Sequence, residues 1–248
     1  MTLSIEGRTA LVTGANRGLG RAFVDGLLAR GARRIYAGTR GDAPWSDPRV
    51  VPLTLDITDA AQVQDAVARC PDVDLLVNNA GILRLDPLVG AADDSAARQA
   101  MEVNYFGTLR MCRAFAPVLA ANGGGALVNV LSIASWVAPP ASGGYGASKA
   151  AAWSMTNAVR VELREQGTLV VAVHAGFIDT DMVTRVRAPK ASPSDVVAQV
   201  LDGVAQGAEE VLVDDESRAT KAALPRDLEE LYPRLQQVWD ARRRGPRS

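Results

Sequence analysis

Short apolar runs alternate with stretches of helical spacing along most of the chain. The runs have the length and the β-branched content of strands, and the segments between them carry apolar residues three or four positions apart. Seven strands are predicted, at residues 8–13, 34–39, 50–55, 73–77, 126–131, 169–173 and 211–213. Strands that alternate with helices form a parallel sheet with helices on both faces. The pattern therefore predicts an α/β fold with a doubly wound, seven-stranded parallel sheet.

The segments between the strands predict helices, with two exceptions. Helices are expected from about residue 22, at 60–69, 94–121 and 145–166, and from Ser192-Pro193 onward. Residues 41–49 contain two prolines and are expected to form a loop. Gly123-Gly124-Gly125 is expected to be a flexible hinge before the fifth strand.

The last part of the chain carries an apolar stripe that includes Leu228, Leu235 and Trp239. Pro233 interrupts this stripe, so it predicts two short helices or one kinked helix. Its apolar face must be buried, either on the chain's own body or on a neighbouring subunit. No repeat or low-complexity linker divides the chain, so residues 1–248 are expected to form a single domain.

Composition and charge narrow the class of protein. The chain is 48% hydrophobic and 22% charged with a net charge of −1, which gives no general attraction to nucleic acid or membranes. Cys70 and Cys112 have neither metal-site spacing nor a disulfide framework, and no signal peptide or membrane-spanning run is found. We therefore expect a cytoplasmic protein without a metal site. His174 is the only histidine, and we interpret it as structural.

A glycine-rich turn follows the first strand and precedes a helix. The sequence is Gly14-Ala15-Asn16-Arg17-Gly18-Leu19-Gly20. In this context the glycines let the backbone approach a pyrophosphate, and the helix N-terminus offers free N–H groups to it. The alternative is a plain tight turn between strand and helix.

The end of the second strand indicates which dinucleotide is bound. A site for NAD usually has an acidic residue there, whereas this chain has Gly38, Thr39 and Arg40, with no carboxylate before Asp42. Arg17 and Arg40 can converge on a 2′-phosphate, because a guanidinium group donates two parallel hydrogen bonds. This predicts NADP(H); the alternative is that both are ordinary surface arginines.

Tyr145 and Lys149 lie four residues apart and share one face of a predicted helix. A nearby ammonium group favours the phenolate and lowers the pKa of a tyrosine, so that it can exchange protons with a substrate oxygen. Ser132 ends the fifth strand thirteen residues before Tyr145, which allows its hydroxyl to lie beside the phenol. Asn104 lies in the middle of a helix, where an asparagine is either exposed to solvent or functional.

Together these motifs resemble the short-chain dehydrogenase/reductase family, in its NADP-dependent carbonyl reductase and 3-oxoacyl-reductase-like branch. The resemblance covers about residues 5–182, and the region from about 183 to 248 is variable in such proteins. The matching motifs are residues 13–20, Asp56, residues 78–81, Asn104, Ser132, residues 145–149 and residues 176–180. The resemblance implies a Rossmann-type fold and hydride transfer between NADP(H) and a carbonyl or secondary alcohol.

The resemblance also implies roles for the matching residues. Tyr145 would be the acid or base, and Lys149 would lower its pKa and bind the nicotinamide ribose. Ser132 would polarise the substrate oxygen, and Asn104 would hold a water that connects Lys149 to solvent. Asp56 and Ile57 would flank the adenine, Asn79 to Gly81 would line the cofactor cleft, and Ile178 and Thr180 would hold the carboxamide. The implied cofactor site is Gly14, Asn16, Arg17, Gly18, Leu19, Gly20, Arg40, Asp56, Ile57, Asn79, Ala80, Gly81, Tyr145, Lys149, Gly176, Ile178 and Thr180.

The expected substrate is a hydrophobic ketone or aldehyde, because the residues that flank the motifs are apolar. These are Leu83, Leu85, Trp136, Val137, Phe177 and Met182. The short segment at 183–190 suggests an open cleft. Relatives often form dimers or tetramers through two long helices, here near 95–121 and 145–166, so a homo-oligomer is expected. Two alternatives stay open: a non-catalytic protein that senses NADP(H), and an epimerase or dehydratase.

Overall fold

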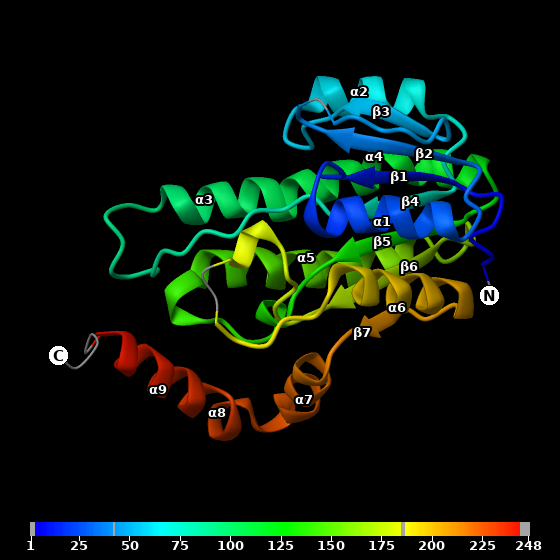
Figure 1. Ribbon diagram of the computed structural model, residues 1–248. Coiled ribbons are helices and arrows are strands. Elements are labelled where there is room, and N and C mark those ends of the chain that lie inside the picture. The colour runs from blue at the N-terminus through cyan, green and yellow to red at the C-terminus, as the bar shows by residue number, and fades with distance from the viewer. Residues whose placement is uncertain (1–2, 42, 185–186, 244–248) are drawn as a thin grey trace.

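The computed structural model describes residues 3–41, 43–184 and 187–243, and its strands form one parallel sheet (Figure 1). Its strands are β1 (Thr9–Thr13), β2 (Arg34–Thr39), β3 (Val50–Thr54), β4 (Leu75–Asn78), β5 (Ala126–Val130), β6 (Leu169–His174) and β7 (Glu210–Leu212). The spatial order is β3-β2-β1-β4-β5-β6-β7, so the direction of winding reverses between β1 and β4. This is the doubly wound Rossmann-type fold, and the predicted fold class is confirmed.

The helical segments connect these strands in the order that the apolar spacing predicts. The α-helices are α1 (Gly18–Ala29), α2 (Ala60–Arg69), α3 (Ser95–Met101), α4 (Thr108–Ala121), α5 (Gly143–Glu162), α6 (Pro193–Gln206), α7 (Asp215–Ala223), α8 (Asp227–Glu230) and α9 (Tyr232–Arg243). A π-helix, η1 (Glu102–Gly107), joins α3 to α4. The 3₁₀ turns are η2 (Ile133–Ser135), η3 (Pro140–Ser142), η4 (Asp181–Val183) and η5 (Leu224–Arg226).

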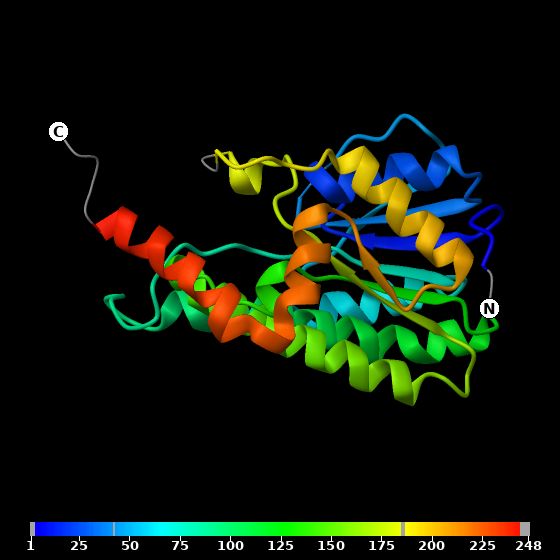
Figure 2. The ribbon, with the colours of Figure 1, turned by 90° about the horizontal axis from the view of Figure 1, so that it is seen from below.

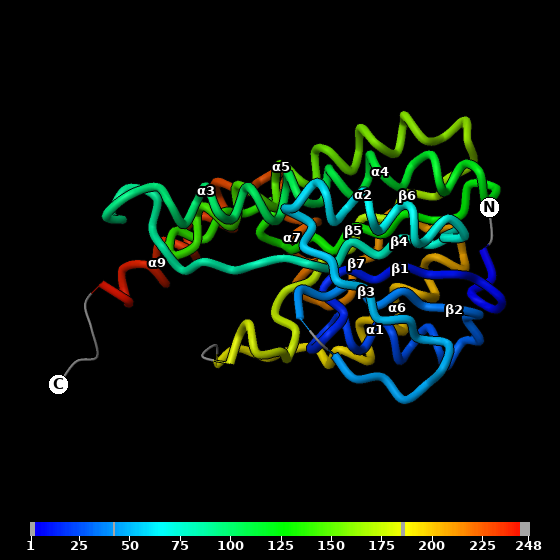
Figure 3. Tube along the Cα trace, turned by 90° about the horizontal axis from the view of Figure 1, so that it is seen from above, coloured from blue at the N-terminus to red at the C-terminus, as the bar shows by residue number. Residues whose placement is uncertain are grey.

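Helices cover both faces of the sheet, as Figures 2 and 3 show from opposite sides. Alternate residues of each strand point to opposite faces. On β1, Val12 packs in the core beneath α1 and α6, whereas Leu11 packs in the core beneath α2, α4 and α5. Both cores are built from fully buried aliphatic side chains and two phenylalanines, Phe23 in one and Phe115 in the other. The near-continuous apolar strands of the sequence follow from this double coverage.

The carboxyl ends of the parallel strands lie together at one edge of the sheet. In all three views α3, η4 and α9 project from this edge. Residues that follow β1, β2, β4, β5 and β6 are therefore brought close together, although they lie far apart in the sequence. In open α/β sheets this edge is where ligands bind.

Several elements differ in detail from the expected ones. The predicted helix at 94–121 is continuous in direction but contains the π-helical turn that includes Asn104. The helix that carries Tyr145 begins two residues earlier, at Gly143. Helix α7 was not predicted, because it is short and its residues are mostly polar; it is started by a capping box between Asp214 and Ser217.

The expectation of a flexible hinge at residues 123–125 is wrong. All three glycines have positive φ angles, and the last two are tightly packed. A Cβ at Gly125 would lie 1.9 Å from the carbonyl oxygen of Asp74, and a Cβ at Gly124 would lie 2.4 Å from that of Gly167. The segment is a close-packed turn that only glycine can form.

The C-terminal tail forms two helices, α8 and α9, rather than the single kinked helix that was the other expectation. The break falls at Leu231, and Pro233 is the second residue of α9, where a proline is well tolerated. Among residues 3–41, 43–184 and 187–243, none of the helices combines the length and the apolar character that a membrane crossing needs.

Candidate active site

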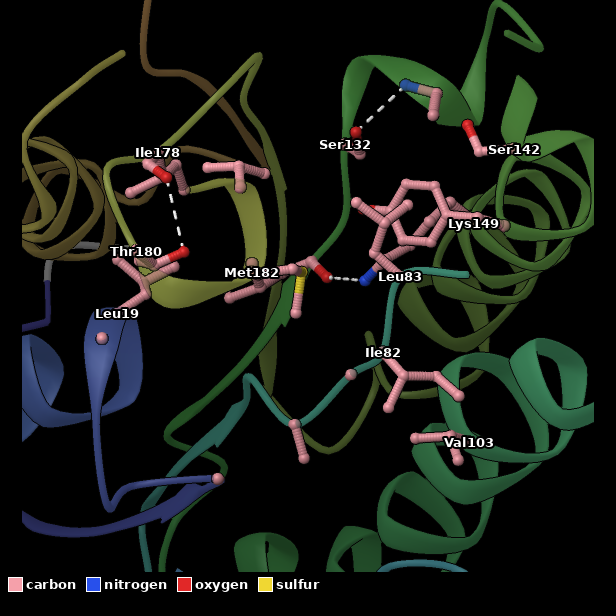
Figure 4. A pocket seen from close by; sticks show the side chains of 18 of the residues that line it. Leu19, Ile82, Leu83, Val103, Ser132, Ser142, Lys149, Ile178, Thr180 and Met182 are labelled. Carbon is pink, nitrogen blue, oxygen red and sulfur yellow. Dashed lines mark hydrogen bonds between the residues drawn. The ribbon is translucent and has the colours of Figure 1, made fainter. Parts of the chain in front are cut away.

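A cavity of about 1150 Å³ lies at the carboxyl edge of the sheet. Its walls come from the glycine-rich turn, from the segments that follow β2, β3, β4, β5 and β6, and from α5 and α9. Figure 4 shows Ser132, Ser142 and Lys149 on one side, Leu19, Ile178 and Thr180 on the other, and Ile82 and Val103 below them. The cavity therefore collects most of the residues that the sequence motifs singled out.

The glycine-rich turn forms one end of the cavity. Gly20 lies so close to the turn that a Cβ there would be 2.1 Å from the carbonyl oxygen of Gly14. The residues of the turn that line the cavity are Gly14, Asn16, Arg17, Gly18, Leu19 and Gly20. Helix α1 begins at Gly18 with no capping side chain and no acidic residue in its first turn. Its free N–H groups and positive dipole end therefore fit an anionic group such as a pyrophosphate.

Arg17 and Arg40 both line this end of the cavity, but they do not behave alike. Nη1 of Arg17 lies 3.1 Å from Oδ2 of Asp181, and both side chains are largely exposed. An exposed pair of this kind contributes at most about 1 kcal/mol, so an incoming phosphate can displace it. Arg40 is exposed at the end of β2 and forms no ion pair with another described residue. Asp42 lies outside the described residues.

The segments after β3 and β4 form the wall beside the glycine-rich turn. Asp56, Ile57, Asn79, Ala80 and Gly81 all line the cavity. The carboxylate of Asp56 accepts hydrogen bonds from the amide and the hydroxyl of Thr58, at 2.9 and 2.7 Å, which fixes its orientation. The hydroxyl of Thr13 accepts hydrogen bonds from the amides of Asn79 and Ala80, both at 3.0 Å. These bonds hold the segment after β4 against β1.

Ser132, Tyr145 and Lys149 meet in the cavity, as their spacing predicts. Ser132 follows β5, and its Oγ accepts a hydrogen bond of 3.1 Å from the amide of Ala134. Lys149 is buried, and its Nζ donates a hydrogen bond of 2.8 Å to the carbonyl oxygen of Val130. The same Nζ lies 5.9 Å from the centre of the Tyr145 ring. A substrate oxygen in the cavity can therefore reach a serine hydroxyl and a phenol supported by a cation.

The pKa of Tyr145 is shifted in the direction opposite to the expected one. Burial raises it, because the phenolate loses hydration, and the Ser132 hydroxyl acts against this rise. Lys149 was expected to lower the pKa of Tyr145, but its ammonium is bound to Val130, and burial lowers its own pKa to about 8. In this geometry Tyr145 holds its proton at neutral pH, which suits a group that donates a proton to a substrate oxygen.

Asn104 lies in the π-helical turn and is buried. Its Oδ1 accepts a hydrogen bond of 2.8 Å from the amide of Ile82. Its Nδ2 donates to the carbonyl oxygen of Ile82 at 3.0 Å and to Oγ of Ser148 at 2.9 Å. Of the two readings of this residue, exposure to solvent is wrong. The Asn104 side chain therefore links the segment after β4 to α5 at Ser148, the residue before Lys149.

The segment after β6 forms the wall opposite Ser132. Gly176, Ile178 and Thr180 line the cavity, and the amide of Gly176 donates a hydrogen bond of 2.8 Å to Oδ2 of Asp214. The Cγ2 of Thr180 is 3.1 Å from where a Cβ on Gly18 would lie, so this segment packs against the glycine-rich turn. All the expected cofactor residues thus line one continuous cavity.

The apolar lining is only partly as expected. Leu83, Leu85, Phe177 and Met182 line the cavity, whereas Trp136 and Val137 do not. The Trp136 ring is instead stacked on His174, with 3.9 Å between the ring centres. The turn η2 directs it behind the cavity wall, and the sequence alone does not show this direction.

Sequence reasoning missed the contribution of the C-terminal helix. Leu235, Val238, Trp239 and Arg242 of α9 line the cavity, together with Pro139 to Ser142. The available signal was the apolar stripe of the tail, which had to be buried somewhere. Of the segment at 183–190, Val183 and Arg187 line the cavity; residues 185 and 186 lie outside the described residues. The described residues hold no cluster of three or more His, Cys, Asp or Glu side chains that could bind a metal ion.

Comparison with curated proteins gives relatives over most of the chain. Sorbitol dehydrogenase of Cereibacter sphaeroides is 35% identical over 187 residues, which are 71% of this chain and 73% of that protein. A 3-oxoacyl-(acyl-carrier-protein) reductase of Escherichia coli is 32% identical over 218 residues, which are 84% of this chain and 88% of that protein.

Solved structures with a similar fold include complexes with a dinucleotide. A short chain dehydrogenase of Burkholderia cenocepacia in complex with NADP has a TM-score of 0.90 and 46% identity, and the match covers 94% of this chain and 99% of that one. An NADPH-bound carbonyl reductase from chicken fatty liver has a TM-score of 0.74 and 27% identity, over 81% and 87% of the two chains. The family model described as short chain dehydrogenase matches residues 8–191. The chain therefore belongs to the short chain dehydrogenase family.

Proposed function

We propose that the protein is an NADP(H)-dependent oxidoreductase that acts on a carbonyl or secondary alcohol of a hydrophobic small molecule. The observation that carries this proposal is the meeting of Ser132, Tyr145 and Lys149 in a cavity whose other end is the uncapped N-terminus of α1. Membership of the family and the NADP complexes of two relatives support it. The apolar lining by Leu83 and Phe177 supports a hydrophobic substrate.

NADP(H), when bound, would supply or accept the hydride. The residues of the chain control the proton and the position of the substrate. Negative charge develops on the substrate oxygen during reduction, and the hydroxyls of Ser132 and Tyr145 stabilise it by hydrogen bonding. Tyr145 then gives its proton to this oxygen, or takes one from an alcohol in the reverse direction. Nζ of Lys149 lies 5.9 Å from the centre of the Tyr145 ring, so its charge attracts the phenolate once the proton has left, although burial outweighs it in setting the pKa of Tyr145.

Removal of the Tyr145 hydroxyl tests the mechanism. In Tyr145→Phe the developing oxyanion loses its proton donor, so turnover of ketones and aldehydes should fall by a factor of about 10³ or more. Binding of NADPH, measured by calorimetry, should stay within about threefold, because the phenol contributes little to the pyrophosphate and 2′-phosphate contacts. The matched control is Tyr232→Phe on α9, since Tyr232 does not line the cavity. Full activity in Tyr145→Phe would refute the mechanism.

The choice of NADP(H) over NAD(H) rests on Arg40 at the end of β2. Wild-type protein should prefer NADPH to NADH by about tenfold or more in kcat/KM, because the guanidinium binds the 2′-phosphate. Arg40→Asp should reverse this preference, since a carboxylate repels the phosphate and accepts a hydrogen bond from a ribose hydroxyl. A wild-type preference for NADH would contradict the assignment. Tight NADPH binding without turnover of any ketone or aldehyde would favour a sensor of NADP(H).

We also propose that the chain is a single-domain, cytoplasmic protein that forms a homo-oligomer through α4 and α5. The support is a groove between these helices, lined mostly by small or apolar side chains such as Leu109, Ala151 and Ala158, with Arg113 and Glu162 also lining it. Small residues on one face of a helix let a second helix approach closely. The same surface on two copies can pack by a two-fold axis, as homodimers usually do.

A further inference from the structure

Helix α9 forms the outer wall of the cavity at the end away from the glycine-rich turn. This end, the substrate end, is lined by Arg187, by residues 139–142 and by Leu235, Val238, Trp239 and Arg242 of α9. Leu235, Val238, Trp239 and Arg242 follow one another at spacings of three, one and three, which places them on one face of the helix. Outside the tail, α9 packs against η3, whose residues also line the cavity. Leu235 and Trp239 of the apolar stripe therefore face a ligand space rather than a solid core, whereas Leu228 is exposed.

The charges around the cavity are unequally compensated. The charged residues that line it are Arg17, Arg40, Asp56, Glu102, Lys149, Asp181, Arg187 and Arg242. Arg17 pairs with Asp181, and Glu102 lies 3.3 Å from Arg110 outside the cavity. Lys149 belongs to the reacting centre, and Arg40 and Asp56 lie at the dinucleotide end. In the part of the chain that the structure describes, Arg187 and Arg242 form no ion pair.

The substrate end thus combines an apolar wall with two exposed arginines that have no ion-pair partner among the described residues. None of the described residues that line this end is acidic, since Asp181 lies at the glycine-rich turn, 3.1 Å from Arg17. An uncharged hydrophobic ligand would use Leu235 and Trp239 but leave both guanidinium groups bound only to water. A ligand that ends in a carboxylate or phosphate uses both features, because guanidinium groups bind such oxygens in pairs of parallel hydrogen bonds.

We propose that the substrate carries an apolar body, held against Leu235 and Trp239, and an anionic group that Arg187 and Arg242 bind. This inference rests on the proposed function, since it names the class of molecule on which the reacting centre acts. The substrate is then an amphipathic oxo or hydroxy acid, or the phosphate-bearing equivalent. The reacting carbon lies beside Ser132 and Tyr145, and the anion lies at the mouth of the cavity, between α9 and the segment after η4.

A series of phenyl ketones with a terminal anion tests this inference. The probes carry a carboxylate two to eight methylenes from the carbonyl, and each has two matched partners, the methyl ester and the phosphate monoester. Binding to the protein saturated with NADP is measured by calorimetry, and turnover is measured with NADPH. At the best chain length the anions should bind about tenfold more tightly than the ester, which is the effect of one ordinary charge-assisted hydrogen bond. The preference should shrink as salt is added.

Variants of α9 and of the segment after η4 show where the preference arises. Arg242→Gln and Arg187→Gln should each reduce the ratio of anion to ester binding by about threefold or more. The matched control is Arg243→Gln, because Arg243 is the neighbour of Arg242 on the same helix and is exposed like it, but does not line the cavity. The control should keep the wild-type ratio. If the carboxylate probe binds more tightly than the phosphate monoester, the substrate is an oxo or hydroxy acid. If the phosphate monoester binds more tightly, the substrate carries a phosphate.

The outcomes separate this inference from the proposed function. If the anions bind preferentially but no probe is turned over, the inference stands and the proposed catalytic function fails. If esters and anions bind equally at every chain length while ketones are reduced, the proposed function stands and the inference is overturned. An equal loss of the ratio in Arg243→Gln and Arg242→Gln also overturns it, because a general surface charge effect would then explain the preference.

Discussion

His174 is fully buried behind the reacting centre, although it touches none of the cavity. Its Nδ1 lies 3.1 Å from the carbonyl oxygen of Ser132, so this nitrogen carries the proton and donates it there. The opposite ring nitrogen has no hydrogen-bond partner and lies 3.7 Å from Oε1 of Glu210. Burial lowers the pKa of His174 to about 4, so the ring is neutral over the working range. The neutral ring helps to hold the main chain that carries Ser132.

A pH dependence of stability follows from His174. Its pKa falls from 6.5 in the unfolded chain to about 4 in the folded one, so the unfolded chain takes up a proton first. The free energy of unfolding should therefore drop as the pH falls from about 6.5 to about 4, by up to about 3 kcal/mol. Urea denaturation across this range measures the slope.

The control is His174→Gln, which removes the only histidine of the chain. Its free energy of unfolding should change less with pH than that of the wild type. Burial raises the pKa of Asp74 and of Glu216, and this effect stabilises the fold as the pH falls, but it is present in both proteins. If the free energy of unfolding falls equally with pH in both proteins, the burial of His174 does not cause the loss of stability at low pH.

At the residue scale, the sequence predicted which reacting groups meet but not their protonation. Ser132, Tyr145 and Lys149 could be placed together because a strand end, one loop and one helical turn fix their spacing. The pKa of Tyr145 could not be predicted, because it depends on desolvation by segments far away in the sequence. The place of Trp136 was wrong for a similar reason, since the direction of a loop side chain is set by its tertiary contacts.

At the scale of the elements, the turn before β5 makes a sharp test of packing. Gly125 has φ of +61°, and its missing Cβ leaves room for the carbonyl oxygen of Asp74, which accepts a hydrogen bond from Ala126. Gly125→Ala should destabilise the fold by about 3 kcal/mol or more, because the methyl group forces β4 and β5 apart. Urea denaturation, or the yield of folded protein, measures this loss.

Gly123→Ala is the matched control for the same turn. Gly123 also has a positive φ, of +85°, but nothing lies within 4 Å of its missing Cβ. The substitution should cost only about 1 kcal/mol of backbone strain. Equal losses for Gly123→Ala and Gly125→Ala would mean that strain alone, and not the approach of β4, makes glycine necessary here.

The elements of the sheet were largely predictable because their signals are local. Apolar runs marked the strands to within about two residues. The start of α2 is also local, since Asp59 caps it with bonds to two backbone amides. The π-helical turn at Asn104 could not be predicted, because an extra residue in a helical turn does not alter the apolar pattern enough to be seen. Helix α7 was missed because it is short and mostly polar, and its capping box, with a serine in place of the usual glutamate, gives only a weak signal.

At the scale of the whole molecule, the groove between α4 and α5 predicts how copies of the chain associate. Ala158→Arg places a long charged side chain in this groove and should shift the protein from dimer or tetramer toward smaller species. Sedimentation velocity at micromolar concentration measures the change. Ala198→Arg on α6, on the opposite face of the sheet, is the matched control and should leave the assembly unchanged. A wild-type monomer would contradict the proposal.

The tail shows why the whole cavity could not be predicted from the sequence. The apolar stripe required burial, and the sequence left two partners for it, the chain's own body or another subunit. The structure places Leu235 and Trp239 over the chain's own cavity. Only the path of the chain after β7 decides between the two, and no local motif encodes that path.

The reversal of winding between β1 and β4 has a consequence for how such a chain can change over time. Residues 34–57 supply the end of the cavity with Arg40 and Asp56, and residues 126–149 supply Ser132, Tyr145 and Lys149 from the other half of the sheet. The two sets of residues come from opposite halves of the sheet, and only β1 and β4 lie between them. A graft of β2 and β3 from a homologue can therefore replace one specificity while the chemistry of the other half is inherited intact.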